Sequence, residues 1–216
     1  KNFLTNGIQG GMVPIAAGVA LFNKKKNNQS ISVAFIGDGT LGEGIIYETI
    51  NIASNWNLPL LIIIENNSYA QSTSFRQTFS GDIGTRFKGF GADYLKCSSF
   101  DLDNLDSILK KSVENCRTKS KPTVVEVQTY RLNSHSKGDD NRDPNEVQHY
   151  KSMDLINNWD PSEDSLIELK EYESYLYDLV KEIDMDDTIG LDYFDQPYIE
   201  NKSIISNNYS ETSNKR

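Results

Sequence analysis

The sequence predicts an α/β protein in which helices flank a parallel sheet. Three short apolar runs are typical of strands that are buried on both faces of such a sheet; they are Ile31–Ile36, Leu60–Ile64 and Thr123–Val127. Helical patterns alternate with these runs and cover Val13–Lys26, Glu43–Asn55 and the stretch from Leu102 to Cys116. This order indicates parallel strands joined by right-handed crossovers.

Each helical pattern has its own support. Val13–Lys26 is rich in Ala and ends in a cluster of Lys and Asn, as the last turn of a helix often does. Glu43–Asn55 lies between the first two predicted strands. From Leu102 to Cys116, apolar residues recur at helical spacing and form one stripe, which predicts a helix with one face against the sheet.

The composition changes after the third predicted strand. Residues 134–145 are rich in Ser, Gly, Asp and Asn without periodicity, so we expect a mobile loop. Asp160-Pro161-Ser162-Glu163 predicts a helix start, with Asp160 as the cap and Pro161 in the first turn. The expected organisation is an α/β domain over 1–154, an acidic helical extension over 155–187, and an acidic and then Asn/Ser-rich tail or linker over 188–216.

The net charge of −9 is unevenly distributed. Between Asp160 and Glu200, fourteen Asp and Glu residues face only two Lys, whereas the first 159 residues are nearly neutral. A nucleic-acid-binding protein would normally carry a basic face, because phosphate neutralisation supplies most of its affinity. The sequence has no such face, so we do not expect nucleic acid as a partner.

Membrane and disulfide-rich classes are also excluded by the sequence. No apolar run approaches the roughly 18–20 residues of a membrane-spanning helix, and the first residues lack a secretory leader pattern. Cys97 and Cys116 lie far apart, with no CxxC motif. We therefore expect a cytoplasmic protein, or one of an organelle matrix if a leader has been removed, with no membrane partner.

Polar residues follow two of the predicted strands. Gly37-Asp38-Gly39 comes directly after the first strand, and Glu65-Asn66-Asn67 ends the second. By itself a Gly-Asp-Gly segment is more often only a tight turn. Together, however, the two segments bring a carboxylate, a carboxamide and a glycine turn to the carboxyl edge of one sheet, where ligands bind in α/β proteins. Oxygen ligands beside a phosphate-binding turn suit magnesium diphosphate.

These segments resemble a known signature. Gly-Asp-Gly followed about thirty residues later by Asn-Asn is similar to the thiamine-diphosphate motif. Three flanking stretches are similar to the α subunit of 2-oxo acid dehydrogenase E1 components: residues 6–14 (NGIQGGMVP), 65–73 (ENNSYAQST) and 130–136 (YRLNSHS). The resemblance runs from about Asn6 to Asp154 and implies the thiamine-diphosphate-binding fold, with thiamine diphosphate and Mg²⁺ as cofactors.

The resemblance implies roles for named residues. Asp38, the side chain of Asn67 and the backbone carbonyl of Tyr69 would bind magnesium. The cofactor would also be held by the residues Gly7, Gln9, Gly37, Gly39, Thr40, Arg131 and His135. Among these, Gly39 and Thr40 would meet the diphosphate through backbone N–H groups, and Gly7 and Gln9 would hold the aminopyrimidine through the backbone. Most members of the family have an apolar residue in place of Gln9.

Arg131 and His135 would act at the mouth of the site. Arg131 would neutralise phosphate charge, with an ordinary surface cation as the alternative. His135 would be the catalytic residue that assists acyl transfer to a lipoyl group, because an imidazole donates and accepts protons near neutral pH; the alternative is a solvent-exposed loop histidine. The family often has a second histidine where this chain has Asn133. We interpret His149 as structural.

Two other residues, Ser136 and Glu43, each have two possible roles. Ser136 matches a site of inhibitory phosphorylation in some relatives, although an ordinary loop serine is the favoured reading. Glu43 is similar to a glutamate that related enzymes place at a subunit interface, where the carboxylate would couple two cofactors. A carboxylate that interacts with the start of its helix is an equal alternative.

The implied function is that of the α-type half of an E1 component. It would carry out oxidative decarboxylation of a 2-oxo acid and transfer the acyl group to lipoyl on an E2 protein. A β-type subunit or domain would supply the activating glutamate, because no segment of this chain resembles the β-type half that carries it. The resemblance starts inside the cofactor domain of the family, so we also expect a fragment of a longer chain. The alternatives are an acetoin-cleaving or split transketolase-like enzyme and a non-catalytic interaction module.

Overall fold

The computed structural model describes residues 4–136, 138 and 140–185. The chain divides into two units, Lys1–Trp159 and Asp160–Arg216. The predicted acidic and Asn/Ser-rich tail, 188–216, lies outside the described residues. In the described part of the chain, no helix is both long and apolar enough to cross a membrane.

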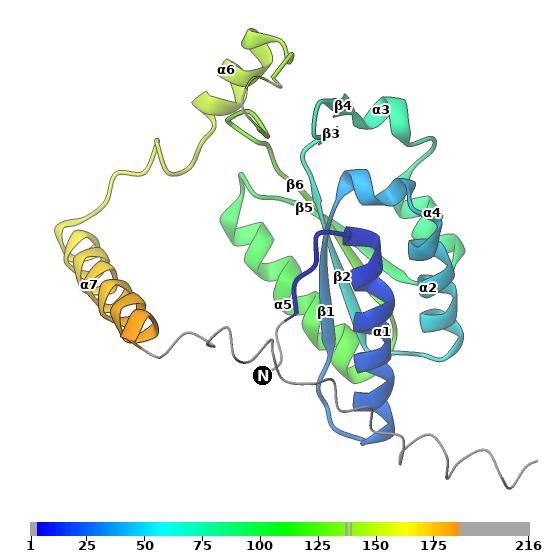
Figure 1. Cartoon of the computed structure of the whole chain (residues 1–216). Coiled ribbons are helices and arrows are strands. Elements are labelled where there is room, and N and C mark those ends of the chain that lie inside the picture. The colour runs from blue at the N-terminus through cyan, green and yellow to red at the C-terminus, as the bar shows by residue number, and fades with distance from the viewer. Residues whose placement is uncertain (1–3, 137, 139, 186–216) are drawn as a thin grey trace, which may run out of the picture. The chain divides into compact units, whose positions relative to one another are not determined.

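The first unit is built on a four-stranded parallel sheet, which confirms the predicted fold class (Figure 1). Its strand order is β1 (Ser32–Gly37), β2 (Leu60–Asn66), β6 (Thr123–Gln128) and β5 (Asp93–Ser98). The first three strands correspond to the predicted apolar runs. The edge strand β5 is absent from the sequence prediction, because DYLKCS is short, contains two charged residues and has no continuous apolar run.

Helices cover the two faces of the sheet unequally. Helices α1 (Gln9–Lys25), α2 (Gly44–Asn55) and α4 (Ile83–Gly89) lie on one side, and α5 (Leu102–Lys119) lies on the other (Figure 1). Leu60, Ile62 and Ile64 of β2 pack into the core on the first side, whereas Leu61 and Ile63 pack against α5. A continuous apolar run therefore fills both cores from one strand, as a strand covered on both faces requires.

The expectation that every predicted strand is buried on both faces is wrong for β1. Val33 is 40% exposed and Phe35 is 62% exposed, whereas Ser32, Ala34 and Ile36 are buried. The reason is the position of β1 at the edge of the sheet. Helix α5 packs mainly on β5, β6 and β2, and it leaves the side chains of Val33 and Phe35 partly uncovered.

Short elements follow the carboxyl ends of the strands. The 3₁₀ helix η1 (Asp38–Gly42) follows β1, and the two-stranded ribbon of β3 (Tyr69–Ala70) and β4 (Thr73–Ser74) follows β2. Helix α3 (Phe75–Thr78) comes directly after this ribbon. Helix α6 (Pro144–Ser152) begins inside the predicted loop 134–145, contains His149 and is absent from the sequence prediction.

Two predicted helix starts shift in the structure. Helix α1 begins at Gln9 rather than Val13, so Pro14 lies inside it. In the second unit, α7 spans Glu163–Met185. The hydroxyl of Ser162 accepts the Ser165 N–H at 3.2 Å, so Ser162 occupies the capping position expected of Asp160.

Replacing a core aromatic side chain should be much more costly than replacing an exposed one. Phe87 of α4 is fully buried, whereas Phe35 lies on the uncovered face of β1. We expect Phe87→Ala to lower the free energy of unfolding by about 3–5 kcal/mol, because it leaves a cavity. Urea denaturation of the isolated chain measures this loss. Phe35→Ala is the matched control, and equal losses in the two variants would contradict the described packing.

Candidate active site

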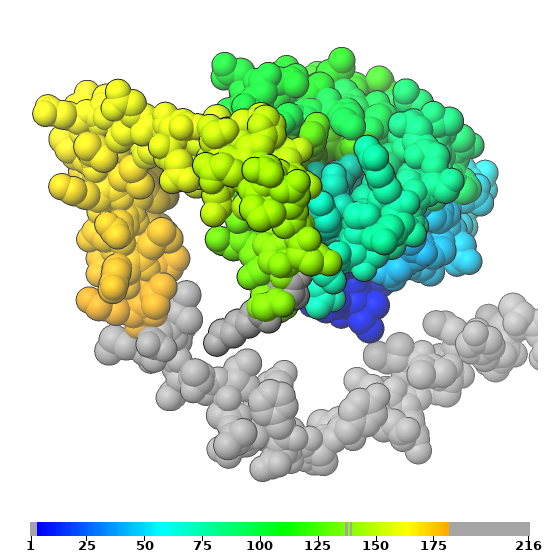
Figure 2. All heavy atoms as spheres, turned by 90° about the horizontal axis from the view of Figure 1, so that it is seen from above, coloured from blue at the N-terminus to red at the C-terminus, as the bar shows by residue number. Residues whose placement is uncertain are grey.

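Three segments meet where the strands end. The segments after β1, β2 and β6 leave the same edge of the sheet because Gly37, Glu65 and Val127 are aligned in the parallel register. Figure 2 looks down on this edge and shows the segment that follows β2 beside the segment that follows β6. A guanidinium N–H of Arg131 donates to the backbone carbonyl of Gln71 at 2.7 Å and joins these two segments.

Asp38 is buried at this edge of the sheet. It is 2% exposed, and its Oδ2 atom has no hydrogen-bond partner among the described residues. Burial raises the pKa of its carboxyl group, while backbone N–H groups, including those of Asn67 and Gly39, lower the pKa in part. A buried carboxylate oxygen without a partner is costly unless a cation or a donor meets it. This atom therefore fits the predicted role as a metal ligand.

The turn after β2 carries the other two predicted metal ligands. The side-chain oxygen of Asn67 accepts the Tyr69 N–H at 2.9 Å. A carboxamide oxygen has two lone pairs, so it can accept this bond and still bind a cation. The described residues contain no cluster of three His, Cys, Asp or Glu that could hold a metal ion. The predicted ligands include only one residue of these four types, Asp38, so they do not count as such a cluster. A carboxylate, a carboxamide and a carbonyl supply the oxygen atoms that Mg²⁺ prefers.

Gln9 makes contacts that sequence reasoning did not anticipate. Its side-chain oxygen accepts the Gly37 N–H at 3.1 Å and the Thr40 hydroxyl at 2.6 Å. The resemblance implies only a backbone role for Gln9. Its side chain instead ties the start of α1 to the Gly-Asp-Gly turn, which an apolar residue at this position cannot do.

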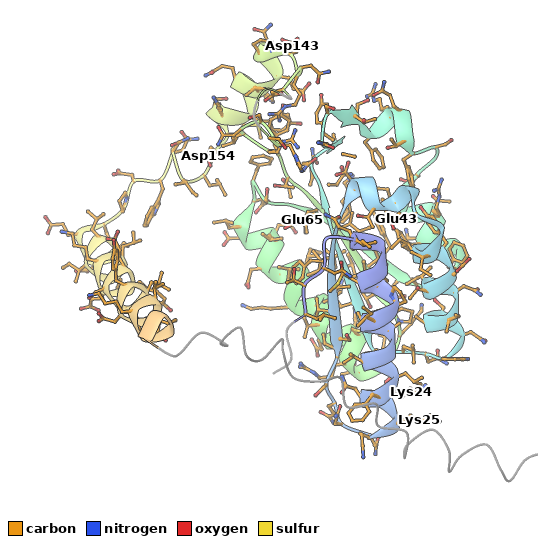
Figure 3. All side chains as sticks on the ribbon, viewed as in Figure 1. Lys24, Lys25, Glu43, Glu65, Asp143 and Asp154 are labelled. Atoms are coloured by element: carbon orange, nitrogen blue, oxygen red, sulfur yellow. The ribbon has the colours of Figure 1, made fainter. Side chains whose placement is uncertain are left out.

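Glu43 also reaches α1. It occupies the N-cap position of α2 without capping that helix, and its Oε1 atom accepts the Gly10 N–H at 3.2 Å. Figure 3 shows Glu43 at the end of α1 opposite to Lys24 and Lys25. The carboxylate therefore lies at the positive end of the α1 dipole, while the two lysines lie at the negative end. The helix-start interpretation of Glu43 thus holds for α1 rather than for α2.

Arg142 holds the segment after β6 in place through hydrogen bonds and an ion pair. This guanidinium is buried, donates to the backbone carbonyls of Arg131 and Asn133, and pairs with the Asp140 carboxylate at 2.6 Å. Its hydrogen bonds lower the pKa of Asp140 to about 2. His135 is exposed in the same segment, with its Nδ1 atom 3.0 Å from the Ser136 hydroxyl oxygen.

Glu146 links α6 to the candidate site. Its carboxylate accepts the hydroxyl of Tyr69 at 3.0 Å and that of Tyr130 at 3.0 Å. Burial and this hydrogen bond raise the pKa of Tyr130 to about 12. The Tyr130 ring stacks on Tyr150 with 3.8 Å between centroids. The residue expected to offer its backbone carbonyl to the metal, Tyr69, is therefore anchored through its side chain as well.

Sequence reasoning missed Glu126, Arg142 and Glu146. A signal existed for Glu126, because it is the single charged residue in the apolar run TVVEV. Arg142 and Glu146 carried no such signal, since they lie in a polar stretch without periodicity. The structure brings Asp38, Gly39, Thr40, Gln9 and Asn67 together at the edge of the sheet. It leaves Gly7 and His135 exposed.

Comparison with known proteins identifies the relatives of this chain. The family model described as "Dehydrogenase E1 component" matches residues 1–176. The chain belongs to this E1 family. It is 35% identical over 189 residues to a pyruvate dehydrogenase E1 component subunit alpha from Rickettsia bellii, a match that covers 82% of this chain and 57% of the relative. The E1-family chain thus spans little more than half the length of that relative.

Two further matches cover a smaller share of this chain. A pyruvate dehydrogenase E1 subunit alpha from Rhizobium meliloti is 35% identical over 150 residues, with 68% of this chain and 43% of the relative covered. Among solved structures, a transketolase from Campylobacter jejuni matches with a TM-score of 0.51 and 24% identity over 57% of this chain and 20% of that chain. At this identity the transketolase supports the fold of the E1-family chain alone.

A methyl group added at Gly39 should disturb the site, because η1 approaches β3 closely there. A Cβ atom at Gly39 would lie 2.5 Å from the Cβ atom of Ala70, whereas one at Gly42 would meet no atom within 4 Å. We expect Gly39→Ala to lower the thermal midpoint of the chain by several degrees and Gly42→Ala to leave it nearly unchanged. Thermal unfolding followed by circular dichroism measures both midpoints. Equal midpoints would show that η1 and β3 do not pack as described.

Proposed function

We propose that this chain is the α-type half of an E1 component, which acts with thiamine diphosphate and Mg²⁺ in the oxidative decarboxylation of a 2-oxo acid. The observation that carries the proposal is the buried Oδ2 atom of Asp38, which has no hydrogen-bond partner among the described residues and lies beside the turn of Asn67. Membership of the E1 family supports the same function. The acyl group would pass to a lipoyl group on an E2 protein.

The residues at the edge of the sheet would divide the binding task. Asp38, the side chain of Asn67 and the carbonyl of Tyr69 would hold Mg²⁺, and the backbone N–H groups of Gly39 and Thr40 would face the diphosphate. Because Gly39 has no side chain, η1 can pack closely against Ala70 of β3, which holds this turn in place. The positions of Gly7 and Gln9 at the start of α1 suit backbone contacts to the aminopyrimidine. When bound, thiamine diphosphate supplies the electron sink that lets CO₂ leave.

Arg131 and His135 would act at the mouth of the site. The Arg131 guanidinium has five N–H groups, so its bonds to the carbonyls of Gln71 and Asn133 leave donors for a phosphate. His135 would hold or release a proton at its imidazole during acyl transfer. A β-type partner would complete the site by supplying the glutamate that contacts the aminopyrimidine.

The relatives are named for pyruvate, so pyruvate is the first 2-oxo acid to test. The chain should be co-expressed with a β-type partner, and CO₂ release should be measured with pyruvate and with branched-chain 2-oxo acids. Release that depends on thiamine diphosphate, Mg²⁺ and both chains is the expected result. Cofactor binding without 2-oxo acid turnover would favour an acetoin-cleaving or transketolase-like enzyme, and no binding would favour a non-catalytic module.

Asp38→Asn should separate binding from folding. The variant removes the one charged metal ligand, so we expect the affinity for thiamine diphosphate with Mg²⁺ to fall by more than about 100-fold. A buried amide costs less than a buried unpaired carboxylate, so the free energy of unfolding of the cofactor-free chain should stay the same or rise. Calorimetric titration and urea denaturation measure the two effects. Normal cofactor binding by the variant would exclude Asp38 as a metal ligand.

His135→Ala should slow acyl transfer more than decarboxylation. The imidazole is assigned to proton transfer towards lipoyl, so the reaction with an artificial electron acceptor should be less affected. The two rates should be compared in the complex with the β-type partner and E2. His149→Ala is the matched control, because His149 is exposed in α6 and contacts the Tyr150 ring. Equal losses in both assays for His135→Ala would indicate a structural role.

A further inference from the structure

A carboxylate is buried in the sheet beneath the candidate site. Glu126 of β6 is 2% exposed and lies within the apolar run TVVEV. Three donors from neighbouring strands reach it. The Oε1 atom accepts the Asn66 amide at 2.9 Å and pairs with the Lys96 ammonium at 2.9 Å, and the Oε2 atom accepts the Tyr94 hydroxyl. The proposed function assigns no role to this residue.

The sheet register explains why these groups meet. Glu126 is aligned with Lys96 of β5 and with Ile64 of β2. Side chains alternate between the faces of a strand, so Asn66 lies on the same face as Ile64, two residues closer to the carboxyl edge. Glu126 therefore lies directly behind the end of β2, where the turn of Asn67 begins.

The contact with Glu126 determines which way the Asn66 amide points. An ionised carboxylate only accepts hydrogen bonds, so the Asn66 NH₂ group must face Glu126. The Asn66 side-chain oxygen then points to the turn and accepts the Ser68 N–H at 3.1 Å. Ser68 has a φ of 67°, in the left-handed region that non-glycine residues seldom adopt, and this bond helps to hold it there.

We infer that Glu126 is a positioning residue for the metal-binding turn: through the Asn66 amide, it holds the Asn67–Tyr69 segment in the shape that presents its two magnesium ligands. This inference rests on the proposed function, which assigns those ligands. It requires no contact between Glu126 and the cofactor. Residues behind metal ligands commonly change metal affinity by about 10–100-fold when they are replaced.

A role limited to holding the sheet together makes a different prediction. In that case the bonds to Tyr94 and Lys96 would matter, and the orientation of the Asn66 amide would not. Exchanging the donor and the acceptor between Asn66 and Glu126 separates the two roles. Asn66→Asp places two carboxylates against each other. Asn66→Asp with Glu126→Gln restores one donor and one acceptor in the reverse order and leaves an oxygen at residue 66 for the Ser68 N–H. The Lys96 ammonium loses its acceptor in this variant, but its side chain is 54% exposed and can turn to solvent.

The experiment uses the full chain with its β-type partner and titrates Mg²⁺ and thiamine diphosphate by calorimetry. We expect Asn66→Asp to weaken binding by about 10–100-fold, and the double variant to return to within a few-fold of the wild-type affinity. Glu114→Gln, an exposed change on α5, is the control and should bind as the wild type does. Wild-type affinity in Asn66→Asp, or no recovery in the double variant, would overturn the inference.

A second measurement does not depend on the cofactor. Hydrogen–deuterium exchange of the Ser68 amide in the full chain should be faster in Glu126→Leu, in which the Asn66 amide loses the acceptor that orients it. Unchanged exchange would overturn the inference even if the wild-type protein binds thiamine diphosphate. If the wild-type chain binds no cofactor but exchange is still faster in Glu126→Leu, the positioning of the turn by Glu126 is supported and the proposed function is refuted.

Discussion

The parallel register of β1, β2 and β6 is the constraint from which the candidate site follows. It aligns Gly37, Glu65 and Val127, so three segments that are far apart in the sequence leave the sheet at one level. The register is set by apolar side chains on both faces of β2, because a shift by one residue would move each of them to the opposite core. The core thus brings Asp38 beside the turn of Asn67.

Two carboxylates are buried in or beneath the candidate site, although a buried charge normally lowers the stability of a core. Asp38 and Glu126 are both buried, and they differ in their partners. Glu126 has three donors and can hold the Asn66 amide in one orientation. Asp38 has an oxygen atom without a partner among the described residues. This difference suits the proposed cation site, in which Asp38 would meet the cation and Glu126 would support the turn that carries the other ligands.

The sequence predicted the parts of the fold that depend on continuous apolar runs. The strands β1, β2 and β6 and the helices α2 and α5 were placed within a few residues. It did not predict β5, whose polar residues suit an edge strand, nor α6, which lies in a polar stretch. The Gly-Asp-Gly and Asn-Asn segments pointed to the candidate site. The side-chain contacts of Gln9, Arg142 and Glu146 join distant segments, and no local pattern encodes them.

The proposed function requires that this chain hold one half of a site for thiamine diphosphate and Mg²⁺. The most direct test is calorimetric titration of both into the wild-type chain, first alone and then with a β-type partner. We expect binding that appears or tightens sharply when the partner is present and that disappears without Mg²⁺. Absence of binding under both conditions would contradict it.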